Sequence, residues 1–325
     1  MIVERYQDAM ANSWDSLVRS SRNGTFLFIR DYMDYHRDRF DDHSLVIRGE
    51  GDELLAALPA HRVGDRIVSH DGLTYGGLIF GPGMKTPTVL GAIELVGLYL
   101  RERGFKDLEY KTVPSIYHRH LAEEDRYAMF LLGAEVERRD LLAVVPRVDR
   151  LPYQSRRDRG VKKARASGVR VCEEPAYSEY WELLARTLRE RFQAAPVHSL
   201  AEIARLRERF PENIRLFCAR SEAGELLAGV VVYESERVAH AQYIAASAAG
   251  RTASALDLLF DHLLNDVYRD HPYFDFGASH EDGGRAINVG LIDQKEGFGA
   301  RAVVHDHYRV DLTKFAPGII TGALR

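Results

Sequence analysis

The order of predicted elements repeats once along the chain, and this repeat restricts the fold more than any other feature. Residues 44–48 are predicted as a strand, followed by a turn at 49–52 and a second strand that opens at Glu53. The same order returns at residues 214–220, at 221–224 and at Glu225. Both turns contain glycine or aspartate, residues that suit tight reversals between paired strands. The sequence therefore predicts two hairpins of one type.

The repeat continues beyond each hairpin, through a third strand, an amphipathic helix and a fourth strand. Apolar residues recur in both helices at three- and four-residue spacing, as in a helix with one face in the core. The third strands begin at Arg66 and Arg237, the helices span 89–103 and 253–268, and the fourth strands span 108–110 and 273–276. This order predicts an α/β fold in which each half has a mixed central sheet flanked by helices.

The length and composition fit two soluble domains. At 325 residues the chain exceeds a typical single domain. Residues 146–168 are rich in charge and contain two prolines, so we expect domains at 1–150 and 151–325. The formal charge of −4 gives no overall attraction to nucleic acid or anionic lipid. The N-terminus lacks a basic region, and no apolar run approaches the ~20 residues of a membrane helix, so a cytoplasmic protein is expected.

Three further helices are predicted around the second hairpin. Residues 156–165 form a short basic helix, and residues 178–192 form an amphipathic one. The helix at 199–210 opens with Ser199 and has Glu202 three residues later. This spacing is typical of a capping box, in which each side chain satisfies a backbone donor at the helix start.

Two helices, a hairpin, a third strand, a central helix and a diverging strand form an order that resembles the GNAT acyltransferase superfamily. The whole chain resembles its FemAB-like branch, in which two GNAT domains are fused. The matching segments are Arg-Arg-x-Arg-Gly-x-Lys-Lys-Ala at 156–164, the hairpin at 225–233, AHAQYIAAS at 239–247, YFDFGAS at 273–279 and QKEGFG at 294–299.

The resemblance implies an N-acyltransferase, most simply an N-acetyltransferase. It would move an acyl group from acyl-CoA, such as acetyl-CoA, to an amine of an amino sugar or cell-envelope precursor. The N-terminal domain would bind the acceptor without catalysing the reaction, and the C-terminal domain would carry the chemistry.

The loop that should bind the acyl donor departs from the GNAT pattern. GNAT enzymes hold the pyrophosphate of acyl-CoA in a glycine-rich loop at the start of the central helix, where backbone N–H groups attract phosphate. Here residues 248–255, AAGRTASA, offer one glycine and one arginine. The residues predicted to bind the donor are Ala245, Ser247, Gly250, Arg251 and Ser254.

Two alternatives to a CoA enzyme stay open. FemAB-like relatives that take aminoacyl-tRNA also lack the glycine-rich loop, so an aminoacyl-tRNA-dependent aminoacyltransferase, with tRNA as its partner, is the first. A GNAT-like domain pair that has lost catalysis and binds only a ligand or partner is the second.

Acyl transfer to an amine needs a base, a group that stabilises the oxyanion and a proton donor for the leaving group. The residues predicted to be catalytic are Lys295, Asp275, Glu281, Tyr243 and His198. Strand alternation places Asp275 opposite Phe274 and Phe276, where a carboxylate needs a partner or its pKa rises. Glu281 lies on the loop after that strand, where solvated carboxylates are also common.

The other catalytic candidates follow from the resemblance. His198 lies in a connection that lines the acceptor site of GNAT folds, although a second helix-capping contact is the alternative. In GNAT folds a backbone N–H of the third strand, here within 243–246, binds the oxyanion, and Tyr243 would protonate the leaving thiolate, unless it is simply a half-buried tyrosine of the strand. In FemAB-like proteins the residue matching Lys295 contacts the substrate or the acyl group; the alternative is an ion pair with Asp293 or Glu296.

Several polar or glycine-rich positions are predicted to bind the acceptor. They are Tyr75, Gly76, His240, Ser279, Asn288, Arg157 and Lys162. His240 and Tyr243 stand three residues apart, so strict alternation predicts opposite faces of the strand. Arg157 and Lys162 belong to the basic helix and would bind phosphate groups of the acceptor, unless that helix is simply solvated.

Two histidine pairs invite comparison with metal sites. They are His118 with His120, and His305 with His307. On a strand, residues i and i+2 share a face, but the sequence shows no third ligand near either pair. We therefore expect no metal cofactor. The sequence leaves the acceptor, the acyl chain length and the oligomeric state undefined.

Overall fold

The computed structural model describes residues 1–324 and divides the chain into two compact units. The first unit contains residues 1–140 together with the C-terminal residues from 304 onward, and the second contains residues 141–303. The expected boundary at residue 150 therefore differs from the observed one. The break falls earlier, and the end of the chain returns to the first unit.

Long-range contacts explain this return. Strand β17 (Arg301–Asp311) pairs antiparallel with β8 (Asp107–Lys111), from His307 opposite Lys111 to Asp311 opposite Asp107. In the segment after β17, three backbone N–H groups donate hydrogen bonds to the Glu94 carboxylate. They are those of Gly318 (2.9 Å), Ile320 (2.8 Å) and Thr321 (2.7 Å). These contacts join residues far apart in the sequence, so no local sequence pattern predicts them.

Unit 1 contains two groups of strands. One forms a sheet in the order β1-β3-β4-β7. The other follows the order β2-β5-β6-β8, with the C-terminal part of β17 paired to β8. The strands are β1 (Ile2–Arg5), β2 (Asp41–Asp42), β3 (Leu45–Arg48), β4 (Leu54–Leu58), β5 (His61–Val63), β6 (Arg66–Val68) and β7 (Ile79–Phe80). The helices are α1 (Ala11–Ser20), α2 (Arg30–Met33), α3 (Thr86–Glu102) and α4 (Glu124–Leu131).

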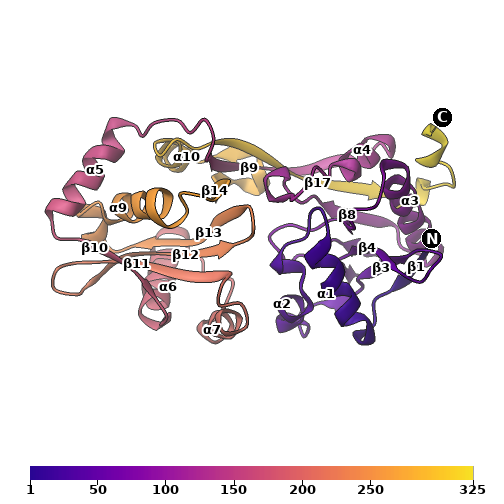
Figure 1. The fold of residues 1–325 in the computed structure, drawn as a ribbon, viewed down its shortest axis with the longest axis horizontal. Helices are drawn as coiled ribbons and strands as arrows, with labels where there is room; N and C mark the ends of the chain where they lie inside the picture. Colours follow the sequence, from indigo (N-terminus) through magenta and orange to yellow (C-terminus); the bar gives the residue numbers. More distant parts are fainter. Residues whose placement is uncertain (325) are drawn as a thin grey trace. The chain divides into compact units, whose positions relative to one another are not determined.

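Unit 2 is a sheet with helices on both faces. The strands follow the order β10-β11-β12-β13-β14, with the C-terminal part of β9 (Glu135–Pro146) beside β14. Helices α5 and α9 cover one face, whereas α6 and α7 lie on the other (Figure 1). The strands are β10 (Arg170–Glu174), β11 (Ile214–Arg220), β12 (Leu226–Glu234), β13 (Val238–Ala246) and β14 (Tyr273–Ala278). The helices are α5 (Ser155–Ala166), α6 (Ser178–Phe192), α7 (Leu200–Arg209), α8 (Ala248–Thr252), α9 (Ala255–His262) and α10 (Val289–Glu296).

The predicted duplication is visible in the strand pairing. In unit 1, β6 runs parallel to β8, and in unit 2, β13 runs parallel to β14. The intervening helices are α3 and α9. The halves also differ, because β12 pairs directly with β13, whereas the corresponding β4 pairs with β7.

Most local predictions are confirmed, and one helix differs. Helix α6 has the predicted bounds, and Ser199 and Glu202 form the predicted capping box at the start of α7. The helix expected at 253–268 begins instead after Ser254, which has a left-handed backbone (φ 57°), and ends in a π-helical turn at Leu263–Val267. Within residues 1–324, no helix combines the length and apolarity that crossing a membrane requires.

Candidate active site in the second unit

Strands β13 and β14 pair for only three residues and then diverge. Their parallel register runs from Val238 opposite Tyr273 to His240 opposite Asp275. Both strands continue beyond this point, β13 to Ala246 and β14 to Ala278. We call the place where pairing ends, at His240 and Asp275, the fork.

A β-bulge in β13 changes which side chains share a face. Val231 lies opposite Tyr243, but Val232 lies opposite Ala241, so Gln242 is an extra residue in β13. Because of this extra residue, the His240 and Tyr243 side chains lie on the same face of the sheet. The prediction of opposite faces is wrong, since it assumed uninterrupted alternation.

Asp275 is the most deeply buried polar group at the fork. Its side chain is 1% exposed and lies opposite the face of Phe274 and Phe276, as predicted. Oδ2 lies 2.9 Å from Nδ1 of His240, and Oδ1 accepts a 2.7 Å hydrogen bond from the backbone N–H of Gly277. The predicted need for a partner is thus met by an imidazole and a backbone amide.

The contact with Asp275 fixes the orientation of the His240 ring. A carboxylate only accepts hydrogen bonds, so Nδ1 of His240 carries the proton that it donates. The lone pair of the neutral ring is then on Nε2. The His240 side chain is 13% exposed, whereas its carboxylate partner is fully enclosed.

Lys295 is also buried beside the fork. The residue is 5% exposed, and Nζ donates to the backbone oxygens of Gly277 (2.9 Å) and Ala278 (2.7 Å). Burial lowers the pKa of Lys295 to about 8, and the charge of Asp275 opposes this shift. Within residues 1–324 Nζ pairs with neither Asp293 nor Glu296, the two predicted alternatives, and Asp293 pairs with Arg156.

His198 and Tyr243 form a second polar pair on the same face as His240. The Tyr243 hydroxyl lies 2.5 Å from Nδ1 of His198, and the Trp181 indole N–H donates to the backbone oxygen of His198 at 3.1 Å. The ring of Trp181 packs edge-on against Tyr243. Burial raises the pKa of Tyr243 to about 12, so its hydroxyl keeps its proton at neutral pH. The structure therefore brings together two predicted catalytic residues that are 45 positions apart.

The predicted donor-binding residues make contacts within the chain. Oγ of Ser247 accepts a hydrogen bond from the Gly250 N–H at 3.0 Å, and the Arg251 guanidinium donates to the backbone oxygen of Ala246 at 2.7 Å. A Cβ at Gly250 would lie 2.0 Å from the backbone oxygen of Leu227, so this glycine is required for packing. Ala245 is buried in β13, and Ser254 separates α8 from α9.

Three predicted residues lie on the segment that follows β14. Glu281 is exposed, and its carboxylate accepts a 2.8 Å hydrogen bond from Nδ2 of Asn288. Asn288 also caps α10 by accepting from the Leu291 N–H. Both side chains thus have partners within the chain, and their roles in catalysis and acceptor binding stay predictions. Ser279 is 2% exposed, and its hydroxyl has no hydrogen-bond partner within residues 1–324.

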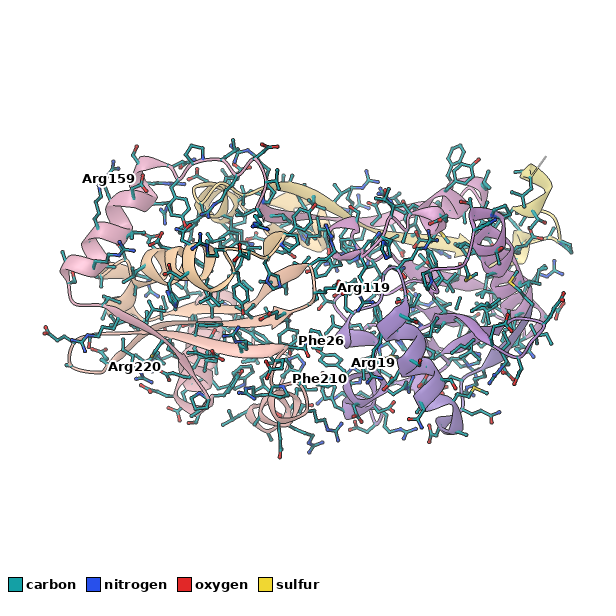
Figure 2. The ribbon with its side chains drawn as sticks, in the orientation of Figure 1. Arg19, Phe26, Arg119, Arg159, Phe210 and Arg220 are labelled. Atoms are coloured by element: carbon teal, nitrogen blue, oxygen red, sulfur yellow. The ribbon has the colours of Figure 1, made fainter. Side chains whose placement is uncertain are left out.

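The basic helix α5 is partly neutralised by acidic partners. Arg157 pairs with Asp257 on α9, so the predicted phosphate contact gives way to an ion pair between two helices. Lys162 is exposed, as is Arg159, which lies on the outer side of α5 (Figure 2). The cationic surface available to a ligand is therefore smaller than the sequence suggests.

In unit 1, the predicted ligand contacts of Tyr75 and Gly76 are internal contacts. Tyr75 is 3% exposed, its hydroxyl donates to Oγ1 of Thr25 at 2.9 Å, and its ring packs on Tyr117. A Cβ at Gly76 would lie 2.0 Å from the backbone oxygen of Ser69. The tyrosine stacks on a core ring, and the glycine permits a close approach between two parts of the chain.

The sequence interpretation missed the link between His240 and Asp275, and it missed Gly277. Position in the predicted strands did not mark them as neighbours, because His240 is fourth in the strand predicted from Arg237 and Asp275 is third in the strand predicted from Tyr273. Register in a parallel pair is set by packing, so the sequence did not show that the two residues are neighbours.

Comparisons with known proteins agree with this fold. Residues 154–282 match the family model described as an acetyltransferase (GNAT) domain. Among solved structures, FemX has a TM-score of 0.66 at 12% identity, covering 94% of this chain and 97% of that one. A tandem GNAT protein from the clavulanic acid biosynthesis pathway has a TM-score of 0.50 at 12% identity, covering 96% and 98%.

A third similar structure is the C-terminal domain of a putative lysylphosphatidylglycerol synthetase from Agrobacterium fabrum. It has a TM-score of 0.57 at 13% identity and covers 98% of both chains. The search of curated proteins gave no match. At these identities the structural likeness establishes the fold, an α/β architecture of two GNAT-like halves.

Proposed function

We propose that the protein is an N-acyltransferase whose reaction takes place at the fork of the second unit. One observation carries the proposal: His240, paired with the buried Asp275 carboxylate, and the buried Lys295 converge where two parallel strands separate. The cluster lies at the carboxyl-terminal end of the parallel pairing between β13 and β14, which is the direction in which open α/β sheets bind ligands. The family match of residues 154–282 supports the reaction class.

In this proposal His240 is the base, and Asp275 orients it. The amine of the acceptor attacks the acyl carbonyl carbon and loses a proton to Nε2 of His240. Asp275 holds the ring in the tautomer with a free Nε2 and stabilises the imidazolium that forms. The assignment of Asp275 as the base is thus replaced by a histidine that Asp275 positions.

The other groups at the fork act on developing charge. The ammonium of Lys295 stabilises negative charge on the donor, because a cation in a water-poor site interacts strongly with an anion. A backbone N–H near the bulge at Gln242 is well placed to bind the oxyanion, since a bulge leaves the ladder locally unpaired. When the bond between the acyl carbon and its leaving group breaks, the Tyr243 hydroxyl donates a proton to that group.

The donor that we place first is acyl-CoA, because the matched family model describes an acetyltransferase. A specific observation favours the second candidate, aminoacyl-tRNA. The Gly250 N–H is already capped by Ser247, and Arg251 already donates to the chain, so both would have to exchange partners to bind a pyrophosphate.

For the acceptor, we propose an amine of an amino sugar or cell-envelope precursor. The name of the Agrobacterium fabrum neighbour, a lysylphosphatidylglycerol synthetase, refers to an aminoacylated membrane lipid, which supports an envelope acceptor. We assign acceptor binding to unit 1 and catalysis to unit 2. A protein that only binds such a ligand is the remaining alternative.

Donor binding and turnover test the proposal together. Calorimetry with acetyl-CoA and filter binding with charged tRNA identify the donor, and acyl transfer to a panel of amines measures turnover. We expect one donor class to bind, with turnover reduced at least ~100-fold in His240→Gln and in Lys295→Ala. Folded variants that retain full turnover would refute the site, and donor binding without turnover on any amine would favour the binding-only alternative.

A further inference from the structure

Unit 1 contains a cluster of three metal-ligating side chains outside the proposed active site. Asp140, His305 and His307 each place a ligand atom so that all three lie within 4.8 Å of one another. Both histidines lie on β17, and as residues i and i+2 they share one face of that strand. Asp140, on β9, supplies the third ligand that the sequence alone does not reveal.

The nitrogen atoms of this cluster are buried and open to a ligand. Nε2 of His305 and Nε2 of His307 have no hydrogen-bond partner within residues 1–324, and His305 is only 3% exposed. A buried ring nitrogen without a partner costs free energy unless something binds it.

The groups around the cluster resemble the outer shell of a metal site. The backbone of Thr112 hydrogen-bonds the His305 ring and fixes its orientation. Arg138 donates to both Asp140 oxygens, at 2.6 and 2.9 Å. Metal-binding histidines and carboxylates are commonly held by such contacts, which orient the ligand atoms.

The spacing fits a tetrahedral ion with little rearrangement. Zinc lies ~2.0–2.1 Å from nitrogen and oxygen ligands, so two ligands of a tetrahedral ion are ~3.4 Å apart. Oδ2 of Asp140 and Nε2 of His307 are 3.5 Å apart. All ligand atoms of the cluster lie within 4.8 Å of one another, so the longest separation has to shorten by at most ~1.4 Å to reach this spacing.

A pocket of about 410 Å³ adjoins the cluster, and Asp140 and His307 are part of its lining. Four carboxylates line it, Asp71, Glu109, Glu137 and Asp140, against two cationic side chains, Lys111 and Arg138. Counting these carboxylates and cationic side chains, the formal charge of the lining is −2, which a divalent cation balances. Three protein ligands beside an open space are typical of a zinc ion that keeps one position for water or a ligand.

We propose that Asp140, His305 and His307 bind one Zn²⁺ ion, whose fourth position faces this pocket and accepts an oxygen ligand such as phosphate. The proposal does not depend on the reaction at the fork, because it concerns a different unit of the chain. It would add a metal to a protein for which the sequence predicts none.

Zinc titration of tag-free, chelator-treated protein tests the site. We expect one Zn²⁺ per chain with a Kd of ~10 µM or tighter, weakened at least ~10-fold in Asp140→Asn and at least ~100-fold in the double variant His305→Gln/His307→Gln. The control is His262→Gln, because Nδ1 of His262 lies 2.8 Å from Oδ2 of Asp266 without a second histidine in the pair. The control should bind zinc like the wild type. Wild-type binding that is substoichiometric, or unchanged in the double variant, would overturn the proposal.

Cobalt substitution of the wild type keeps the test valid if a variant fails to fold. Tetrahedral Co²⁺ gives strong visible absorption bands, whereas octahedral Co²⁺ gives weak ones, and inorganic phosphate should shift the strong bands if it enters the fourth position. Weak bands would contradict the proposed coordination. Strong bands that phosphate does not change would contradict the open position.

Discussion

Nδ1 of His240 lies 2.9 Å from Oδ2 of Asp275, across the last paired position of two parallel strands. The same residues mark the point where β13 and β14 separate. An imidazole oriented by a buried carboxylate thus stands at the mouth of the fork, with Lys295 and the Gly277 backbone beside it.

Asp275→Asn should lower kcat by roughly 10²–10⁴-fold with a smaller change in KM. An amide in place of the carboxylate donates a hydrogen bond toward Nδ1, which moves the imidazole proton to Nε2 and removes the base. Steady-state kinetics measure kcat and KM, and a thermal melt measures the stability of the variant. Asp266→Asn is the matched control, since it changes an exposed histidine partner and should leave kcat unaltered. Equal rates in both variants would refute the orienting role of Asp275.

Acyl transfer should decline as the pH rises through about 8, because burial lowers the pKa of Lys295 to about 8 and the reaction uses its ammonium form. A pH–rate profile measures this limb. A wild-type rate that stays constant from pH 7 to 9.5, with the donor itself stable, would contradict the role of Lys295.

The same lysine should make stability rise with pH. Between its folded pKa of about 8 and its ordinary value of 10.5, the unfolded chain binds the proton more tightly, so unfolding becomes less favourable as the pH increases. Over this pH window the free energy of unfolding of the wild type should increase by up to ~3 kcal/mol relative to that of Lys295→Met. Urea denaturation of both proteins at pH 7.5 and 10 measures these free energies of unfolding. An equal change with pH in the wild type and in Lys295→Met would contradict the prediction.

Gly277→Ala should impair both stability and turnover. Gly277 has a φ of 71°, and a Cβ there would lie 3.2 Å from Cε1 of His240, so the methyl group displaces the imidazole. Gly224→Ala is the control, because Gly224 has a φ of 86° and open space at its Cβ position. Both variants should lose ~1 kcal/mol or more of stability, but only Gly277→Ala should lose activity. Comparable activity in the two would show that the His240 contact is unimportant.

Tyr243→Phe should lower kcat by about 10–100-fold, with the largest effect for donors that have poor leaving groups, since these most need a proton. Tyr180→Phe is the matched control: that tyrosine is also buried, and its hydroxyl has no hydrogen-bond partner within residues 1–324. Kinetics with a series of donor esters or thioesters measures the dependence. An effect that does not vary with the leaving group would indicate a packing role for Tyr243.

Glu94→Gln should destabilise the protein by ~1–3 kcal/mol at pH 7, because charge-assisted hydrogen bonds to the C-terminal segment become neutral ones. Burial alone would raise the pKa of Glu94, but the N–H groups of Thr321, Gly318 and Ile320 outweigh it and lower this pKa. The stabilisation is therefore present above pH 4.5 and is lost as the carboxylate is protonated below it.

Denaturation at pH 7 and pH 4 tests the role of Glu94, with Glu102→Gln on the exposed end of α3 as control. The difference in free energy of unfolding between the wild type and Glu94→Gln should be smaller at pH 4 than at pH 7. A constant difference would mean that its origin is not electrostatic.

The sequence by itself determined the local elements and their repetition. Apolar periodicity placed α6 at its observed bounds, and the spacing of Ser199 and Glu202 predicted the cap of α7. The resemblance around residues 294–299 also singled out Lys295, which the structure buries beside the fork. Such features depend on neighbours within one or two helical turns, so a single chain segment encodes them.

Only the tertiary structure decided which distant residues meet. The pairing of His240 with Asp275 depends on a parallel register between strands 35 residues apart, and the shared face of His240 and Tyr243 depends on one bulged residue. The gathering of Asp140 with His305 and His307 depends on the return of the chain to unit 1. Register and strand order follow from the packing of whole layers, which no short stretch of sequence specifies.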